Sequence, residues 1–80
     1  MYWNVLMEIA NFICRWVLRT NNIQISENDD LFLAGGLDSL NFVELISDLE
    51  MEFNIVVSFD DLLDWNSIRT PFNLQQYINL

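Results

Sequence analysis

Residues 35–53 read GGLDSLNFVELISDLEMEF, which is a pair of glycines followed by an unbroken helical pattern. Paired glycines allow the backbone to turn sharply, and Asp38 and Ser39 are both favoured at a helix N-cap. A step of 100° per residue from Ser39 gathers the apolar side chains on one arc. This arc consists of Phe42, Val43, Leu45, Ile46, Leu49 and Phe53. The pattern predicts a helix from about Ser39 to Phe53 whose apolar arc is buried.

The opposite side of this predicted helix is polar and acidic, with Asn41, Glu44, Ser47, Asp48 and Glu52. Two apolar residues, Leu40 and Met51, fall in or beside that polar side. They are roughly 16 Å apart at the usual helical rise. This arrangement favours a docking strip for a partner protein, with apolar anchors in a negative field. The alternative is incidental exposure, because single exposed hydrophobic residues are common.

The flanking sequence adds helices on both sides. Helical spacing predicts an amphipathic helix over about residues 2–19, whose apolar face carries Val5, Leu6, Ile9, Phe12, Ile13, Trp16 and Val17. The polar side of this helix argues against a membrane span. It is a stripe that consists of Asn4, Glu8, Asn11, Arg15 and Arg19.

A short helix is expected near residues 59–64. Thr70 followed by Pro71 predicts the start of a last helix, with apolar contacts from Phe72, Leu74, Tyr77 and Ile78.

A long loop joins the first two predicted helices over residues 20–38. Asp29 and Asp30 could cap a short turn there, and the apolar residues 31–33 are expected to pin the loop onto the core. Ile23 and Ile25 alternate as in a strand, but no other segment offers a partner strand. The sequence therefore predicts one all-α domain over residues 1–80, a bundle of three main helices and one short helix.

The composition of the chain argues against several classes of function. Twelve acidic residues stand against three arginines, with no lysine or histidine, for a formal charge of −9. Such a surface repels nucleic acid and anionic membranes and attracts basic partner proteins. The charge therefore indicates an acidic interaction module, or it merely keeps a small protein soluble. The commonest general base is missing, and Cys14 has neither a disulfide partner nor a metal-ligand cluster. We expect a cytoplasmic monomer that is not an enzyme and holds no metal.

Ser39 lies at the head of the docking strip. By its residue type it is first of all a helix cap, and as a catalytic nucleophile it lacks an activating base. It can still be an attachment point if another enzyme supplies that base. The N-terminus of a helix also suits a phosphodiester, because exposed amides and the helix dipole favour an anion there.

Residues 31–40, LFLAGGLDSL, resemble the phosphopantetheine attachment site of acyl and peptidyl carrier proteins, in which a leucine–phenylalanine pair precedes G-x-D-S-[LM]. Residues 41–55 are similar to the recognition helix of that family, and the resemblance covers about residues 5–79. It implies a four-helix carrier-protein bundle in which Ser39 receives 4′-phosphopantetheine from a phosphopantetheinyl transferase, with help from Asp38. It also implies that Leu40, Glu44, Ser47, Asp48 and Met51 face partner proteins.

The resemblance further implies an acyl group held as a thioester, loaded by an adenylating ligase or acyltransferase and passed to an acyl-using enzyme. Asn41, Met51 and Val57 depart from common fatty-acid carriers, which favours a specialised pathway. Trp65 gives a faint similarity to D-alanyl carrier proteins, so an aminoacyl, peptidyl or D-alanyl cargo is the alternative. An acidic helical adaptor without a cofactor is a third reading.

Overall fold

Three helices, α1 (Tyr2–Asn21), α2 (Ser39–Phe53) and α3 (Pro71–Ile78), form the regular structure of the chain. The computed structural model describes residues 2–57 and 68–78, with side chains from residue 9 onward. Within these residues there is no strand, and the predicted all-α class is confirmed. The short helix expected near residues 59–64 lies outside the described residues.

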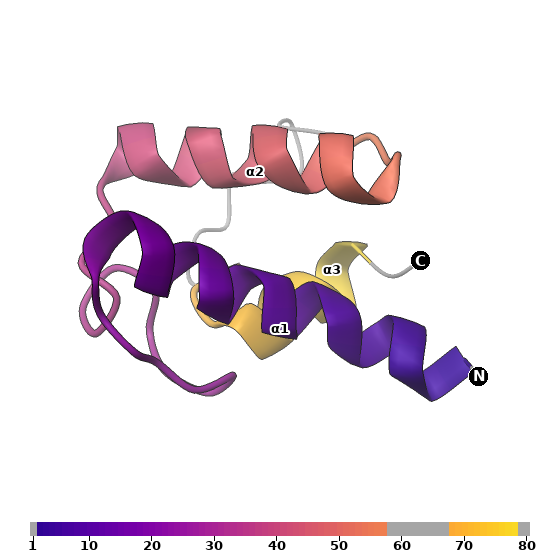
Figure 1. Cartoon of the computed structure of the whole chain (residues 1–80), viewed down its shortest axis with the longest axis horizontal. Helices are drawn as coiled ribbons and strands as arrows, with labels where there is room; N and C mark the ends of the chain where they lie inside the picture. The colour runs from indigo at the N-terminus through magenta and orange to yellow at the C-terminus, as the bar shows by residue number, and fades with distance from the viewer. Residues whose placement is uncertain (1, 58–67, 79–80) are drawn as a thin grey trace.

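The first helix, α1, contacts both of the others. The loop after it reverses the chain, so that α2 runs back antiparallel to α1, while α3 crosses behind α1 in this view (Figure 1). Ile9, Ile13, Trp16 and Val17 are buried, as predicted, while Val5 and Leu6 precede the described side chains. The helix ends at Asn21, two residues later than expected, because Asn22 takes a left-handed conformation with φ of 57°.

The buried side of α2 forms the centre of the core. Phe42, Leu45, Ile46 and Leu49 are completely inaccessible to solvent. Val43 was expected beside them, but its side chain is 44% exposed, and that prediction was wrong. On the helical wheel Val43 stands about 100° from the centre of the buried group, at the edge of the apolar arc.

The third helix, α3, starts at the predicted cap. The Thr70 hydroxyl accepts a hydrogen bond from the Asn73 amide (3.0 Å), and Pro71 occupies the first helical position. Leu74 is fully buried, whereas Phe72 is 41% exposed. The side chain of Gln75, which is also buried, accepts a hydrogen bond from the Ala10 amide (3.1 Å). This bond fixes α3 against α1.

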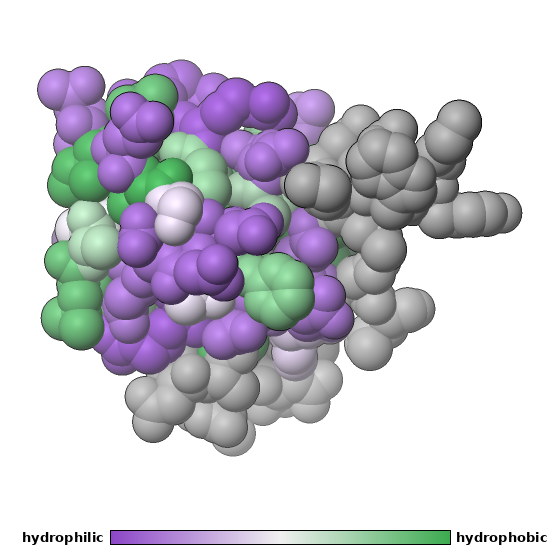
Figure 2. Space-filling model, turned by 90° about the horizontal axis from the view of Figure 1, so that it is seen from below, coloured by the Kyte–Doolittle hydropathy of each residue, from purple (hydrophilic) through white to green (hydrophobic). Residues whose placement is uncertain are grey.

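The surface is mostly hydrophilic on the face turned toward the viewer in Figure 2, and its apolar side chains gather at the end where the long loop lies. None of the helices in the described part of the chain combines the length and the apolar character that crossing a membrane requires.

Candidate functional site

The start of α2 is capped by Asp38. Its backbone is extended, with φ of −106° and ψ of −177°, and its carboxylate accepts a hydrogen bond from the Asn41 amide (Oδ1–N 2.8 Å). Ser39 is then the first residue of the helix. The sequence-based interpretation of Ser39 as a helix cap was therefore wrong. The aspartate carboxylate satisfies the helix amide, which releases the neighbouring serine from that role.

The Ser39 side chain is exposed to solvent. Among the described residues it has no hydrogen-bond partner, because Asp38 does the capping. The first turn of α2 contains no acidic residue, although the chain carries twelve of them. The amides of that turn and the helix dipole favour an anion beside Ser39. An accessible hydroxyl at such a position suits the phosphodiester of a phosphopantetheine group.

Gly35 and Gly36 allow the tight turn through which the loop reaches Ser39. A Cβ on Gly35 would lie 2.6 Å from the backbone oxygen of Leu31, so only glycine fits without a shift. Gly36 has φ of 72°, a conformation that favours glycine. The Asn21 side chain donates a hydrogen bond to the Gly35 carbonyl (3.0 Å), which connects the loop to the end of α1. These contacts define the direction from which the chain enters α2.

The loop itself is organised around Asp30. Its carboxylate accepts hydrogen bonds from the amides of Phe32 (2.8 Å) and Leu33 (2.9 Å), which confirms the predicted capped turn for Asp30. The same carboxylate pairs with Arg69, at 2.6 Å between Oδ2 and Nε. The pKa of Asp30 is lowered to about 2. The hydrogen bonds from Arg69 are the largest cause, and the hydrogen bonds from the two amides lower it further.

Aromatic contacts continue this arrangement into the core. The Arg69 guanidinium lies 5.0 Å from the centre of the Phe32 ring, and Phe32 stacks on Phe42 of α2 with ring centres 5.5 Å apart. The loop is thus attached both to the segment before α3 and to the helix that Ser39 begins. This attachment holds the entry to α2 in a defined place.

Leu31 is fully buried and Phe32 is partly buried, as expected of the residues that pin the loop. Leu33 was predicted to join them but is 84% exposed, so that prediction was wrong. Successive residues of the turn capped by Asp30 point in different directions, and Leu33 points outward. Sequence reasoning therefore missed an exposed apolar residue in the loop that leads to Ser39. The sequence did contain an indication that Leu33 is exposed. Asp30 is a residue that caps turns, and a capped turn directs residues 31–33 to different sides, which an extended segment would not do in the same way.

The predicted docking strip of Leu40, Glu44, Ser47, Asp48 and Met51 lies on the exposed side of α2. All five side chains are exposed, and the apolar pair is 68% exposed at Leu40 and 82% at Met51. Besides lying on the strip, Asp48 makes a contact within the protein that the sequence did not reveal. Its carboxylate accepts a hydrogen bond from the Trp16 indole of α1 (Oδ2–Nε1 2.7 Å). The strip is therefore continuous with the boundary between α2 and α1.

Comparison with known proteins agrees with this geometry. A family model described as "Phosphopantetheine attachment site" matches residues 8–70 of the chain. Similar curated proteins include the D-alanyl carrier proteins of Streptococcus pyogenes serotype M5 (strain Manfredo) and serotype M1. Each is 51% identical over 43 residues, which cover 51% of this chain and 54% of the relative. The chain thus matches these relatives over about half of their length. No solved structure matches it.

The family match covers most of the chain and includes the capped start of α2. Its members are carriers that bear a covalently attached 4′-phosphopantetheine and are not enzymes themselves. The resemblance noted in residues 31–55 is confirmed by this match. The chain belongs to the phosphopantetheine attachment site family of carrier proteins.

Proposed function

We propose that Ser39 receives the 4′-phosphopantetheine and that the chain presents a thioester-bound group to partner enzymes. The observation that supports this assignment is that different residues cap α2 and offer the hydroxyl group at its start. Asp38 caps the helix (2.8 Å to the Asn41 amide), and the neighbouring Ser39 is exposed at the first position. A serine needed for capping would lose that bond on modification, whereas this serine loses none.

The attachment chemistry requires a separate enzyme. The Ser39 hydroxyl would displace the nucleotide half of coenzyme A and form a phosphodiester with the phosphopantetheine half. The base that removes the hydroxyl proton comes from the phosphopantetheinyl transferase, since this chain has no histidine or lysine. We propose that Asp38 has a second role here and helps to orient the serine in that enzyme. The thiol that the group supplies carries the cargo.

D-alanine is the first cargo that we propose. The similar curated proteins are D-alanyl carrier proteins at 51% identity, although over about half of their length. The more general proposal is an acyl group in a specialised pathway, which the same attachment site would serve equally well. In either case an adenylating ligase or an acyltransferase loads the carrier, and a downstream enzyme uses the cargo.

We propose that these enzymes dock on the strip along α2. Leu40 and Met51 provide apolar contacts, and Glu44, Ser47 and Asp48 lie between them. With a formal charge of −9, the chain attracts basic surfaces over a distance. Successive partners must use one surface in turn, so brief contacts with little buried area are suitable. We further propose that residues 1–80 act as a single carrier domain, as a monomer in the cytoplasm.

Mass spectrometry tests the attachment site. The protein is incubated with coenzyme A and a phosphopantetheinyl transferase of broad specificity. We expect the wild type to gain the mass of one phosphopantetheine and Ser39→Ala to gain none. Ser47→Ala is the matched control, because Ser47 is another exposed serine on α2. Modification of Ser39→Ala to the wild-type extent would refute the assignment, and an unmodified wild type would favour the adaptor reading.

The modified protein then tests the cargo. It is incubated with ATP and either D-alanine plus a D-alanine-adenylating ligase, or a fatty acid plus a fatty-acyl ligase. A mass increase of one D-alanyl group that hydroxylamine removes would support the D-alanyl proposal, because hydroxylamine cleaves thioesters. Loading by the fatty acid alone would refute the D-alanyl proposal and support the acyl one.

A further inference from the structure

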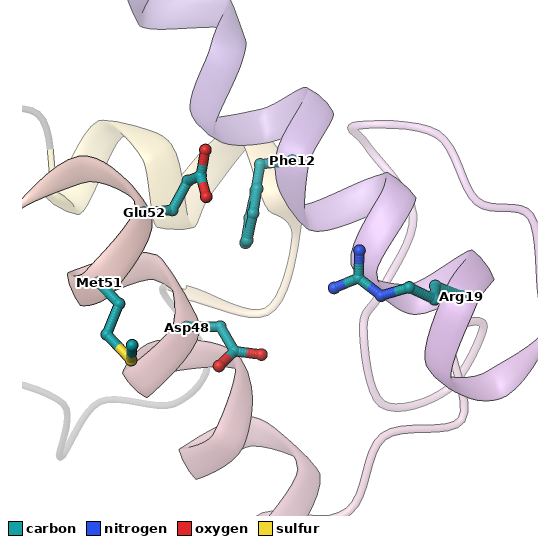
Figure 3. A pocket seen from close by; sticks show the side chains of 5 residues that line it. All are labelled: Phe12, Arg19, Asp48, Met51 and Glu52. Atoms are coloured by element: carbon teal, nitrogen blue, oxygen red, sulfur yellow. The ribbon is translucent and has the colours of Figure 1, made fainter.

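A groove of about 340 Å³ lies between α1 and α2, beside the docking strip. Its lining comes from Phe12 and Arg19 of α1 and from Asp48, Met51 and Glu52 of α2. Figure 3 shows Arg19 at one end with its guanidinium directed into the gap, and Phe12 and Glu52 together at the other end. The groove therefore has the cation of Arg19 at one end and the carboxylate of Glu52 at the other. The Asp48 carboxylate lies on the α2 side between them, and Phe12 and Met51 are its apolar side chains.

Arg19 is the arginine that lines this groove. Of the three arginines, Arg69 is paired with Asp30 at 2.6 Å. Arg19 is exposed and makes no ion pair with any described residue, although Asp48 and Glu52 line the same groove. The Asp48 carboxylate accepts the Trp16 indole hydrogen bond instead (2.7 Å). Arg15 is exposed on α1 as well, but of these two arginines only Arg19 lines the groove.

Continuity with the docking strip indicates what fills the groove. Met51 and Asp48 belong to both surfaces, so a protein docked along α2 would also reach the groove. The hydrogen bond between Trp16 and Asp48 joins α1 to α2 along that boundary. An occupant complementary to the groove needs an apolar side chain between Phe12 and Met51 and a carboxylate facing Arg19.

We propose that α1 takes part in partner recognition, and that this groove receives an apolar side chain of the loading ligase while Arg19 pairs with a carboxylate of that enzyme. This inference rests on the proposed function and adds a second contact to it. Opposite charges at the two ends allow one orientation of the bound segment and oppose the reverse, because like charges would then meet. The binding of a partner that contacts only the docking strip would not depend on Arg19.

The test uses protein that already carries phosphopantetheine and the ligase that loads the wild type. Arg19→Glu is compared with Arg15→Glu, because Arg15 is also exposed on α1 but does not line the groove. Both variants change the net charge equally. We expect Arg19→Glu to raise the KM of the ligase for the carrier about tenfold with kcat unchanged, since like charges then face each other. Arg15→Glu should change KM less than about twofold.

Met51→Ala provides a second variant, because Met51 is exposed and its truncation leaves the core intact. We expect it to raise KM as well, through loss of the apolar contact. Melting curves of all the variants show that the fold is retained. Equal KM values for Arg19→Glu and Arg15→Glu would overturn the inference and leave the attachment site assignment intact. A wild type that gains no phosphopantetheine would overturn both.

Discussion

Asp30 and Arg69 are joined by two parallel hydrogen bonds, from Nε to Oδ2 at 2.6 Å and from Nη2 to Oδ1 at 3.2 Å. The same carboxylate also accepts the amides of Phe32 and Leu33. The Arg69 carbonyl in turn accepts a hydrogen bond from the Leu31 amide (2.7 Å). One residue of the loop therefore caps the local turn and ties that turn to a segment 39 positions away.

This pair should make the stability of the protein sensitive to acid. The pKa of Asp30 falls from 3.8 to about 2, mainly through the Arg69 hydrogen bonds. Because the folded-state pKa is the lower one, the stabilisation is complete above about 4 and disappears as the pH falls through about 2. We expect Asp30→Asn to melt a few degrees below wild type at neutral pH, and this difference to shrink over that range. Thermal melts at several pH values measure it.

Glu44→Gln is the matched control, because it also removes one exposed carboxylate charge, and it should leave the melting temperature nearly unchanged. The effect at Asp30 should stay modest, since both partners of the ion pair are partly exposed. A difference between Asp30→Asn and wild type that persists undiminished at pH 2 would contradict the role assigned to the ionised carboxylate.

The core of α2 could be predicted from local periodicity, whereas contacts between distant segments could not. The wheel drawn from Ser39 identified Phe42, Leu45, Ile46 and Leu49, because helical geometry alone decides which residues share a face. The hydrogen bond from Trp16 to Asp48 spans 32 positions, and nothing in the local pattern specifies that pair. The same holds for Asp30 and Arg69.

The errors at the candidate site have a local cause. Asp38 and Ser39 are adjacent and both cap helices well, and residue type alone does not show which of them caps. In the structure Asp38 is extended and takes the cap, so Ser39 moves into the helix. At Leu33 the error came from treating residues 31–33 as one apolar group. A capped turn separates their directions, and Leu33 is left 84% exposed.

Asp38 can be tested for its two proposed roles separately. Asp38→Ala removes the acceptor for the Asn41 amide and should lower the free energy of unfolding by about 1 kcal/mol. Asp38→Asn keeps an acceptor oxygen, because asparagine caps helices as well as aspartate does, and should melt like the wild type. If the charge also orients Ser39 in the transferase, Asp38→Asn should be modified more slowly at unchanged stability.

Urea titrations and the rate of phosphopantetheine transfer measure these two effects. Ser39→Ala serves as the control for stability, since its exposed hydroxyl does not cap α2. Comparable losses of stability in Ser39→Ala and Asp38→Ala would show that the cap is assigned to the wrong residue.

Asp48 illustrates why docking variants need a stability measurement. Asp48→Ala removes the acceptor of the Trp16 indole, whose residue is only 3% exposed, and should cost about 1 kcal/mol of unfolding free energy. Glu44→Ala, on the same strip, should change stability by less than about 0.5 kcal/mol. Chemical denaturation distinguishes the two. Equal stability of both variants would mean that the indole hydrogen bond contributes nothing measurable in solution.

The two glycines before Ser39 should respond differently to alanine. At Gly35 the new Cβ would lie 2.6 Å from the Leu31 backbone oxygen, so the backbone must move, at a cost of about 1–3 kcal/mol. At Gly36 the new Cβ meets side chains rather than backbone, the end of Ile23 at 3.2 Å and Asn21 Nδ2 at 3.7 Å, and the positive φ costs about 1 kcal/mol.

Denaturant titration of both variants measures this order, and we expect Gly35→Ala to lose more stability than Gly36→Ala. Gly35→Ala should also slow phosphopantetheine transfer to Ser39, because the displaced turn is the segment that leads into α2. The control is Ala34→Gly, which changes the neighbouring exposed position without adding an atom. A Gly35→Ala protein as stable as the wild type would show that the turn relaxes freely, and that the close approach to Leu31 does not determine where Ser39 lies.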